Sequence, residues 1–468
     1  MSTDSDLVVI GAGPGGYTAA IRGAQKGLSV ALVERETVGG VCLNHGCIPA
    51  KALIHAAGFQ KDIDHWNSLG IETGPVDVDY HAIQEWKDEV IDRLDSQVLD
   101  SLDHYGVDLI EGTARFADSS TLQVETDGGG DTQTIDFETA IVATGSQPIE
   151  IPGLEYGKDR VISSREILQV DEVPDEIVVV GGGYIGMEAV TKFSKFGARV
   201  KIVEALDRVL SEFEAEIVDS IQETSEMYSD DIYTSTLAQG VEYDDDGTPE
   251  LLAEKDGDEL RLSGDYIVVA AGREPNSAYE DLELDNTGVE LDDREFIAVD
   301  DQCRTTDDNI LAVGDAAGPP YLAHVAYHEG KVAAAVAAGE ERAVDTEYMP
   351  TVMYTDPEVA TVGLSEAEAT EQYDEVLVGR VPMGSSGRAL TMDKTEGYLK
   401  LIADVDEQLL GVRIVGPRAS DTIAEATLAL ELDASLDDIA STLHAHPTFP
   451  ENLVEAAEAA KNEAIHTH

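Results

Sequence analysis

The chain carries one strand–turn–helix–strand unit twice, and this repeat limits its possible folds more than any other feature. In each copy an apolar strand enters a glycine-rich turn and a helical stretch follows. A second apolar strand then ends in a glutamate about 20 residues beyond the first glycine, which is typical of a dinucleotide-binding fingerprint. The copies span residues 7–34 and 177–204. Because strands that alternate with helices form parallel sheets covered by helices, we expect an α/β protein with two Rossmann-like dinucleotide-binding domains.

Three glycines and one glutamate in each copy have separate expected roles. The first glycine allows the tight turn, the second lets the backbone approach a pyrophosphate, and the third lets the helix pack closely. The N-terminus of the helix then faces the phosphates, and the glutamate accepts hydrogen bonds from ribose hydroxyls. The expected binding residues are Gly11, Gly13, Gly16 and Glu34 in the first copy, and Gly181, Gly183, Gly186 and Glu204 in the second.

The acidic end of the second copy favours NAD over NADP. Enzymes that use NADP tend to place arginines near the extra 2′-phosphate, whereas this chain places Glu204 and Asp207 there. Both carboxylates would repel that phosphate. The alternative is that Glu204 only ends a strand in solvent, but its match to Glu34 in the first copy argues against this.

Cys42 and Cys47 stand at the start of a predicted helix, directly after the first copy. In an ideal helix, Cα atoms five residues apart are separated by roughly 8–9 Å, which exceeds the roughly 7 Å limit for a disulfide. A disulfide therefore requires a distorted first turn, and Asn44, Gly46 and Pro49 are candidates for causing it. A strained, exposed disulfide has the raised potential of a working redox couple. The alternative, two buried thiols that pack as small apolar side chains, fits poorly with a cofactor fingerprint just upstream.

His446 and Glu451 form a further candidate site near the end of the chain. An imidazole can move a proton near neutral pH, and a carboxylate that accepts its second N–H fixes the tautomer and raises the basicity. Taken alone, a histidine and a glutamate five residues apart more often indicate a structural histidine. A dithiol must lose protons when it is oxidised, however, and this dyad is a natural acceptor for them.

Acidic side chains outnumber basic ones strongly, with 94 Asp and Glu against 30 Lys and Arg and a net charge of −64. Such a surface repels phosphate backbones and anionic membranes, so we expect neither a nucleic-acid nor a membrane partner. Acidic composition also occurs in disordered chains, but apolar runs such as residues 7–10 and 177–180 spread the charge over an ordered framework. The composition resembles that of halophile proteins, in which concentrated counterions screen the repulsion.

We expect the protein to be soluble and cytoplasmic. No basic and apolar leader precedes the first strand, and no apolar stretch approaches the roughly 20 residues of a membrane span. With three cysteines in 468 residues a disulfide scaffold is excluded, and cysteines in a reducing compartment are more often catalytic than structural. No metal site is expected.

Breaks rich in proline and glycine divide the chain into three modules. They fall at residues 147–153, 272–276 and 345–350. The acidic run Tyr243–Pro249 lies between strand-like segments and predicts a hairpin turn. After Pro350, strand patterns such as residues 398–402 and helical patterns such as residues 422–432 predict a closing α+β domain.

Together these motifs resemble those of the flavoprotein pyridine-nucleotide disulfide reductases, and within them the dihydrolipoamide dehydrogenases. The resemblance covers essentially the whole chain. Besides the two fingerprints, the cysteine pair with Lys51 and the histidine dyad, it rests on the motifs Ala143-Thr-Gly145, Ala271-Gly-Arg-Glu-Pro-Asn276, Ala312-Val-Gly-Asp315 and Tyr354-Thr-Asp-Pro-Glu358. It implies a homodimeric enzyme that oxidises dihydrolipoamide with FAD and NAD.

The resemblance also implies a role for each site residue. Cys47 would face the flavin as the charge-transfer thiol, and Cys42 would meet the substrate. Lys51 would lie beside the flavin ring, paired with Glu188, and His446 would serve the disulfide of the other subunit. Further FAD-binding residues would be Ala114, Thr144, Gly145, Asp315 and Ala323, and further NAD-binding residues would be Gly272 and Arg273.

Asp315 follows the NAD-binding segment in the sequence but would bind FAD. The FAD-binding domain would therefore be discontinuous. The implied organisation is an FAD-binding domain in residues 1–148 and 274–345, an NAD-binding domain in residues 149–273, and a dimerisation domain in residues 346–468. The sequence departs from the family pattern at four positions. These departures put the fine tuning of the active site in doubt, but not the reaction. They are Val41, His45, Ala50 and Asp356, where Thr, an apolar residue, Ser and His are usual. Cys303 matches no motif and is interpreted as structural.

The motifs are highly specific for the family and less specific for the substrate. The main alternative is an NADH-dependent reductase of another small disulfide. Mercuric reductases carry a C-terminal cysteine pair that this chain lacks, and glutathione-type reductases favour NADPH. An idle FAD-binding subunit is a further alternative, but the intact Cys42, Cys47 and His446 argue against it. The expected protein partner is the lipoyl domain of a 2-oxoacid dehydrogenase or glycine-cleavage complex, and the sequence does not distinguish between these.

Overall fold

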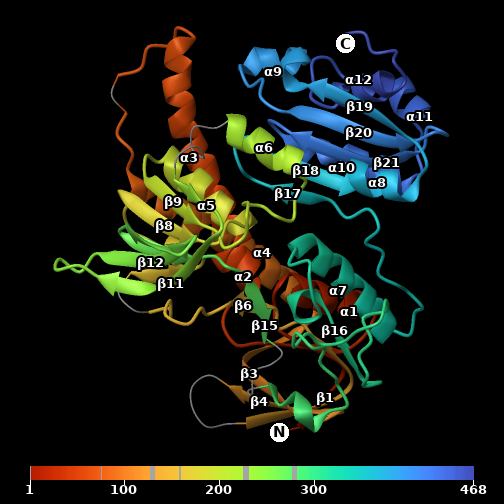
Figure 1. Ribbon diagram of the computed structural model, residues 1–468. Helices are drawn as coiled ribbons and strands as arrows, with labels where there is room; N and C mark the ends of the chain where they lie inside the picture. The colour runs from red at the N-terminus through yellow and green to blue at the C-terminus, as the bar shows by residue number, and fades with distance from the viewer. Residues whose placement is uncertain are drawn as a thin grey trace.

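A computed structural model describes residues 2–74, 76–126, 132–157, 160–224, 231–276 and 282–467. Figure 1 shows three units, each built on its own sheet: the N-terminal sheet at the bottom, a second sheet on the left, and the C-terminal sheet at the upper right. This arrangement confirms the expected α/β class with two Rossmann-like units and a closing α+β unit.

The N-terminal sheet has the parallel strand order β3-β2-β1-β5-β16, and β4 pairs antiparallel with both β3 and β5. Successive residues of β1 point to opposite faces, as in any strand. Leu7 and Val9 enter a core shared with helices α1 and α7, whereas Val8 and Ile10 enter the core on the other face. The elements are β1 (Ser2–Ile10), α1 (Pro14–Gln25), β2 (Val30–Glu34), β3 (Asp108–Asp118), β4 (Thr121–Thr126), β5 (Thr132–Val142), β16 (Ile310–Ala312) and α7 (Ala323–Ala337).

The second sheet is wholly parallel, in the order β10-β9-β8-β14-β7. A separate antiparallel sheet, β11-β12-β13, extends from it. Strands β11 and β12 flank the acidic run 244–248, which confirms the hairpin predicted there. The elements are β7 (Val161–Ser163), β8 (Glu176–Val180), α5 (Tyr184–Lys195), β9 (Arg199–Val203), α6 (Ala215–Thr224), β10 (Ile232–Tyr233), β11 (Thr236–Tyr243), β12 (Pro249–Lys255), β13 (Asp258–Ser263) and β14 (Tyr266–Val269).

The two segments that connect these sheets form a ribbon of their own. β6 (Ser146–Pro148) pairs antiparallel with β15 (Arg273–Pro275), in register from Ser146 opposite Pro275 to Pro148 opposite Arg273. Both stretches fall within or beside the breaks expected from proline and glycine. The extended connections lie side by side, so their backbones hydrogen-bond to each other and form strands where the sequence predicted only breaks.

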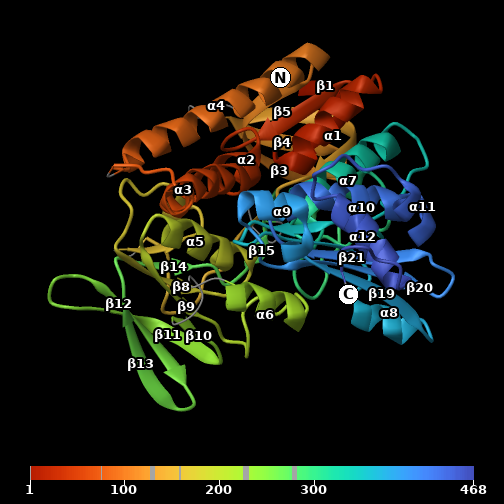
Figure 2. The ribbon, with the colours of Figure 1, turned by 90° about the horizontal axis from the view of Figure 1, so that it is seen from above.

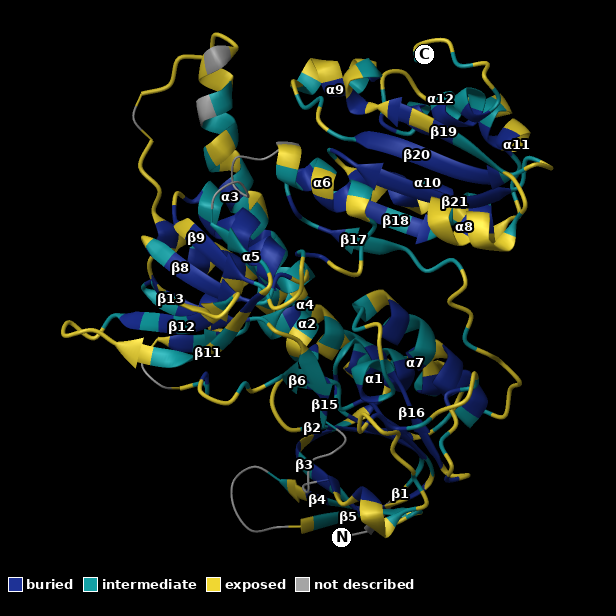
Figure 3. Ribbon diagram, in the orientation of Figure 1, coloured by how far each residue is buried: buried dark blue, intermediate teal, exposed yellow. Residues whose placement is uncertain are grey.

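The C-terminal unit is an antiparallel sheet in the order β17-β18-β21-β20-β19, packed against helices. In Figure 3 its central strands are buried, and exposed residues lie mainly on the helices and loops around them. The expected strand at 398–402 is β20 and the expected helix at 422–432 is α10. The elements are β17 (Thr351–Met353), β18 (Val359–Gly363), α8 (Glu366–Gln372), β19 (Val376–Pro382), α9 (Gly387–Met392), β20 (Tyr398–Asp404), β21 (Leu409–Val415), α10 (Ala419–Glu431), α11 (Leu436–Ser441) and α12 (Glu451–Ala460).

Three helices join the units around the centre of the molecule. α2 (Gly40–His45) and α3 (Cys47–Ser68) follow the first fingerprint, and α4 (Tyr80–Tyr105) leads back to β3. Seen from above in Figure 2, α3 lies beside both α4 and α5 and so connects the first two units. Among the described helices, none combines the length and the apolar character needed to cross a membrane.

Candidate active site

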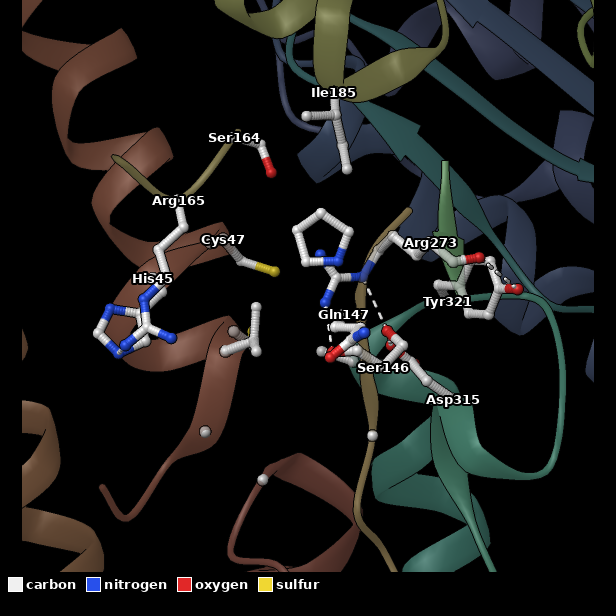
Figure 4. Close-up of a pocket in the computed structure, with 18 of the residues that line it drawn as sticks. His45, Cys47, Ser146, Gln147, Ser164, Arg165, Ile185, Arg273, Asp315 and Tyr321 are labelled. Carbon is white, nitrogen blue, oxygen red and sulfur yellow. Dashed lines mark hydrogen bonds between the residues drawn. The ribbon is translucent and has the colours of Figure 1, made fainter. Parts of the chain in front are cut away.

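A cavity of about 500 Å³ lies where the two parallel sheets meet. Its walls come from the first glycine-rich turn, helices α2 and α3, the start of α5, and the β6–β15 ribbon. Figure 4 shows the sulfur of Cys47 pointing into this space, with His45 and Arg165 on one side and Arg273, Ser146 and Gln147 on the other. The predicted site residues that line the cavity are Gly11, Gly13, Glu34, Cys42, Cys47, Lys51, Thr144, Gly145, Glu188, Arg273, Asp315 and Ala323.

The two glycine-rich turns have the same local geometry. Gly11 and Gly181 have positive φ angles of 96° and 107°, which glycine adopts without strain. A Cβ at Gly16 would collide with the carbonyl oxygen of Gly11, and a Cβ at Gly186 would collide with that of Gly181. A Cβ at the intervening Gly13 would meet nothing within 4 Å, so the chain leaves room there.

Helices α1 and α5 begin directly at these turns, and neither N-terminus has a side-chain cap. No acidic residue occupies the first turn of either helix. The uncapped N–H groups and the positive end of each helix dipole therefore favour an anionic ligand. For α1 this end lies at the cavity, because Gly13, Pro14 and Gly15 line it.

Glu34 and Glu204 bind back to the turns of their own copies. Oε2 of Glu34 accepts the N–H of Ala12 at 2.6 Å, and Oε2 of Glu204 accepts the N–H of Gly182 at 2.6 Å. Each carboxylate oxygen can accept more than one hydrogen bond, so both side chains can still bind a hydroxyl group. The backbone contact fixes each carboxylate beside its glycine-rich turn.

The two cysteines lie on either side of a break between helices. Cys42 is in α2, Cys47 is the first residue of α3, and Gly46 between them has the non-helical angles φ −142° and ψ −103°. The expected distortion is therefore located at Gly46. Asn44 anchors the turn by donating to the carbonyl oxygens of Val38 and Gly40 at 2.8 and 3.1 Å. Pro49 lies inside the first turn of α3, where proline is tolerated, and does not interrupt that helix.

The two thiols differ in their acidity. Hydrogen bonding from Cys42 and the positive charge of Lys51 outweigh burial and lower the pKa of Cys47 to about 7. The same interaction with Cys47, together with burial, raises the pKa of Cys42. Near neutral pH the reduced pair therefore carries its negative charge on Cys47, the thiol that faces the cavity, and its proton on Cys42.

Lys51 and Glu188 form a largely buried ion pair beside the thiols. Nζ of Lys51 donates to both carboxylate oxygens of Glu188, and the N–H of Tyr354 donates to the Oε1 atom at 3.2 Å. The Tyr354 ring also lies 4.9 Å from Nζ. Burial alone would lower the pKa of Lys51, but Glu188 and Cys47 outweigh it, and the pKa is raised. The ammonium group is therefore held charged next to Cys47.

Asp315 lines the cavity and belongs to a network of hydrogen bonds that the sequence did not predict. The hydroxyl of Ser146 donates to its carboxylate, and the Arg273 guanidinium donates to the Ser146 hydroxyl and carbonyl at 2.8 and 2.6 Å. Burial outweighs these contacts and raises the pKa of Asp315. Arg273, expected in the NAD site, thus holds Ser146, and Ser146 in turn donates to Asp315.

Thr144 and Asn276 connect two of the short motifs. The side-chain amide of Asn276 donates to the carbonyl oxygen of Thr144 at 2.9 Å, and its backbone N–H donates to that of Gly145 at 3.0 Å. The Thr144 hydroxyl is buried at the cavity wall and has no protein partner within the described residues. A buried polar atom of this kind normally has a hydrogen-bond partner, so it points to a polar ligand.

His446 and Glu451 lie in the C-terminal unit, between α11 and α12 and at the first residue of α12. Nδ1 of His446 lies 2.8 Å from Oε1 of Glu451, and the N–H of Thr448 donates to Oε2 at 2.6 Å. Burial alone would raise the pKa of Glu451, but Thr448 and His446 outweigh it and lower the pKa. The His446 side chain is 79% exposed, so its other nitrogen is open to a second molecule.

Several of the predicted site residues are not among the described residues that line the cavity. Figures 1 and 2 both place α11 and α12 away from α2, so His446 and Cys42 of one chain are not brought together. Gly16 and Ala114 are buried and are not among the residues that line the cavity. The residues predicted to bind NAD lie around the second glycine-rich turn instead: Gly181, Gly183, Gly186, Glu204 and Gly272.

Arg165 and His45 form a contact that the sequence gave no reason to expect. The guanidinium of Arg165 lies 2.8 Å from Nε2 of His45 and 3.2 Å from the carboxylate of Glu36. Burial and Arg165 lower the pKa of His45. Since arginine only donates, His45 accepts through Nε2. His45 departs from the family pattern, and the only available signal was that departure.

Comparison with known families and proteins agrees with this geometry. Residues 5–330 match the family model described as pyridine nucleotide-disulphide oxidoreductase. Residues 349–457 match the dimerisation domain of the same family.

Curated relatives match over the full length. The chain is 45% identical to "Dihydrolipoyl dehydrogenase 2" of Haloarcula marismortui, with 100% of this chain and 99% of the relative covered. It is 45% identical to the dihydrolipoyl dehydrogenase of Haloferax volcanii, with 100% and 98% covered. It is 42% identical to that of Geobacillus stearothermophilus, with 99% and 97% covered.

Solved structures share the fold. The HOCl-induced flavoprotein disulfide reductase RclA of Escherichia coli, solved as a Cu(II) complex, aligns with a TM-score of 0.86 at 26% identity, and 97% of this chain and 99% of that chain are covered. LpdA of Mycobacterium tuberculosis aligns with a TM-score of 0.90 at 24% identity, with the same coverage.

Proposed function

The chain belongs to the pyridine nucleotide-disulphide oxidoreductase family, and from this premise we propose that it is an FAD- and NAD-dependent dihydrolipoyl dehydrogenase. It oxidises protein-bound dihydrolipoamide to lipoamide and reduces NAD to NADH. The observation that carries the proposal is the placement of Cys47, with a lowered pKa, at the wall of a cavity that also contains the first dinucleotide fingerprint.

The cavity has the features needed to hold FAD. Gly13 leaves room for a pyrophosphate at the uncapped start of α1, Glu34 can accept ribose hydroxyls, and the unpartnered hydroxyl of Thr144 can bind the cofactor. Asp315 and the start of α7 at Ala323 complete the wall. Held by these residues, FAD would supply the two-electron redox chemistry that links the cysteine pair to NAD.

The second fingerprint has the features needed for NAD. The start of α5 is uncapped, and a Cβ at Gly183 would meet nothing within 4 Å. Glu204 stands beside this turn, where its carboxylate can accept ribose hydroxyls and repel a 2′-phosphate. We therefore assign residues 149–273 to NAD, and residues 1–148 with 274–345 to FAD.

The cysteines exchange electrons with the substrate by thiol–disulfide exchange. One substrate sulfur attacks Sγ of Cys42 in the disulfide form, the Cys42–Cys47 bond breaks, and Cys47 leaves as the thiolate that Lys51 stabilises. The second substrate sulfur then attacks the first, which releases lipoamide and reduced Cys42. The substrate loses two electrons and two protons: the cysteine pair gains both electrons, Cys42 keeps one proton as a thiol, and the His446 dyad accepts the other.

The His446–Glu451 dyad accepts the substrate proton. Glu451 holds Nδ1 of His446, and the exposed Nε2 is free to take a proton from the attacking thiol. Within one chain the dyad and Cys42 lie in different units, so the cysteine pair of one subunit works with His446 of the partner subunit. The match of residues 349–457 to a dimerisation domain supports a homodimer with shared sites.

The protein substrate is the lipoyl domain of a 2-oxoacid dehydrogenase or glycine-cleavage complex. The names of the relatives support this partner, because lipoyl groups are carried by such domains. We place the reaction in the cytoplasm, where a cysteine pair can be reduced and reoxidised without becoming a permanent disulfide.

A steady-state assay of the FAD-loaded protein tests the function. We expect turnover of dihydrolipoamide with NAD, and much less with NADP. The second candidate, an NADH-dependent reductase of another small disulfide, predicts faster reduction of glutathione disulfide by NADH. That result, with no turnover of dihydrolipoamide, would contradict the proposal and support the alternative.

A further inference from the structure

One arginine of the second unit binds two residues of the N-terminal unit. Arg165 lies between β7 and the short 3₁₀ helix Glu166–Leu168, in the stretch assigned to NAD. Its Nη1 and Nη2 atoms both donate to Oε2 of Glu36 at 3.2 Å, and Nη2 also donates to Nε2 of His45 at 2.8 Å. Glu36 follows β2 and His45 ends α2, both in the stretch assigned to FAD. The contact therefore bridges the two nucleotide-binding units.

These three side chains lie at the mouth of the cofactor cavity, and we refer to Arg165, Glu36 and His45 together as the clasp. All three line the cavity. Arg165 and Glu36 are nevertheless 41% and 49% exposed, so they stand where the cavity opens to solvent. Figure 4 shows Arg165 and His45 together on one side of the cavity.

Local hydrogen bonds fix both ends of the clasp. On one side, the backbone N–H of Ser163 donates to the carboxylate of Glu166 at 2.8 Å, and the N–H of Arg165 donates to the Ser163 hydroxyl at 3.1 Å. On the other side, Asn44 anchors the turn that carries His45 through its two bonds to backbone carbonyls. The backbone on both sides therefore sets the geometry of the clasp.

His45 contributes an uncharged hydrogen-bond acceptor to the clasp. Burial and the charge of Arg165 lower the pKa of His45, so its ring is neutral near pH 7 and Nε2 keeps its lone pair. An apolar side chain at this position could not accept the bond. The pair of Arg165 with Glu36 is exposed and is screened by salt, whereas the bond to a neutral ring depends far less on ionic strength. At high salt, His45 is therefore the more important partner of the arginine.

Docking of the second unit does not depend on the clasp. Lys51 and Glu188 join the first two units inside the cavity, and the β6–β15 ribbon joins them where the chain crosses. Glu214, directly before α6, also accepts a hydrogen bond at 2.9 Å from the buried Arg413 of the C-terminal unit. The clasp adds a bridge only at the opening of the cavity.

Building on the proposed function, in which FAD fills this cavity, we propose that the clasp retains FAD in its site. Glu36 is two residues beyond Glu34, which is assigned to the ribose, and His45 is two residues before Cys47, which is assigned to the flavin. A cofactor that fills both parts of the cavity lies behind the bridge. It leaves only after Arg165 has released its partners, so Arg165 and His45 are positioning residues that slow the loss of FAD.

The rate of FAD release from the loaded protein tests the clasp. The holoprotein is diluted into molar KCl, and the rise in the fluorescence of free flavin gives the rate. Arg165→Met removes the donors, and His45→Val removes the neutral acceptor. Each should accelerate release by roughly fivefold or more, the effect of losing a hydrogen bond. Glu36→Gln should change the rate by less than about twofold at this ionic strength, because the exposed ion pair is screened.

Three comparisons identify a merely structural effect. His45→Gln keeps an acceptor and should release FAD nearly as slowly as the unsubstituted protein. The combined variant Arg165→Met and His45→Val should release FAD no faster than either single variant, since both remove one contact. Arg199→Met removes an arginine that binds Asp231 in the same unit, away from the described residues of the cavity wall, and should leave release unchanged.

The outcomes distinguish this proposal from the proposed function. If the unsubstituted protein retains FAD but does not oxidise dihydrolipoamide, the proposed function is wrong, while the release rates still decide the clasp. If Arg165→Met and His45→Val both release FAD at the unsubstituted rate, the clasp is wrong. Equal acceleration in Arg199→Met would also overturn it, because it indicates a general loosening of the second unit. Either clasp variant keeps the test decisive if the other does not fold.

Discussion

Nζ of Lys51 lies 2.9 and 2.7 Å from the two carboxylate oxygens of Glu188, so one buried carboxylate holds the charge that acidifies Cys47. The two residues belong to different units, Lys51 to α3 and Glu188 to α5. The acidity of the cysteine therefore depends on how the second unit docks against the first. The two charges act on Cys47 with opposite signs: Lys51 lowers its pKa and Glu188 raises it.

The first prediction concerns the pH dependence of Cys47. Its pKa of about 7 means that the thiolate is present above neutral pH and is lost by protonation as the pH falls through 7. In the reduced protein, alkylation of Cys47 by iodoacetamide should follow this titration. Lys51→Met should raise the midpoint by about one pH unit or more, because a neighbouring positive charge is removed.

Glu188→Gln provides a test of opposite sign, since it should lower the midpoint. Lys26→Met, which removes an ion pair with Glu340, serves as the matched control and should not move it. Peptide mapping assigns the label to Cys47. A midpoint that stays near 7 in the Lys51 variant would show that this charge does not control the thiol.

The second prediction concerns nucleotide choice. Glu204→Gln keeps the shape of the side chain but removes the charge. It should lower kcat/KM for NAD by roughly tenfold, the effect of weakening a charged hydrogen bond, and improve the use of NADP. Asp207→Asn changes a nearby acid that makes no contact with the glycine-rich turn in the described structure, and it should have a smaller effect. An unchanged ratio of NAD to NADP efficiency in the Glu204 variant would refute the assignment.

The third prediction follows from the net charge of −64. The screening length falls from about 10 Å at 0.1 M salt to about 3 Å at 1 M, so molar salt removes most repulsion between surface carboxylates. The Tm should therefore rise steeply with KCl concentration, and dilution should unfold the protein. Thermal unfolding followed by circular dichroism measures this. Full thermal stability in low-salt buffer would exclude a salt requirement. It would not contradict the proposed reaction.

The fourth prediction tests whether the sites are shared. Cys47→Ser and His446→Gln should each be nearly inactive. Refolded together, about half of the dimers should contain one subunit of each kind, and each such dimer should have one intact site of two. Roughly a quarter of the wild-type activity should therefore return, by twofold symmetry. If mass analysis shows mixed dimers and no activity returns, each site is built from one chain.

Much of the fold was predictable because its signals are local. The strand, turn and helix of each fingerprint follow one another in sequence, and the structure has them as β1, α1 and β2, and as β8, α5 and β9. The second strand of the first copy, predicted to end in a glutamate, is β2 (Val30–Glu34), and it ends at Glu34. The closing α+β unit was predictable for the same reason.

Contacts between distant segments were not predictable from local patterns. The bond from Arg273 to Ser146 joins residues far apart in the chain, and so does the hydroxyl contact of Tyr17 with Tyr327. Neither contact follows from a motif, because it depends on which helices and connections the fold brings together. The family resemblance supplied the pairing of Lys51 with Glu188, which no spacing rule could have given.

The ribbon of β6 and β15 has a consequence for how such a protein can be rebuilt. The chain leaves the N-terminal unit and returns to it at paired positions, so the second unit is an insertion whose two ends lie next to each other. An insertion of this kind can be exchanged as a cassette, because only two neighbouring junctions must be rejoined. A nucleotide-binding unit with a different preference could replace residues 149–272 and leave the cysteine pair and the dimerisation domain in place.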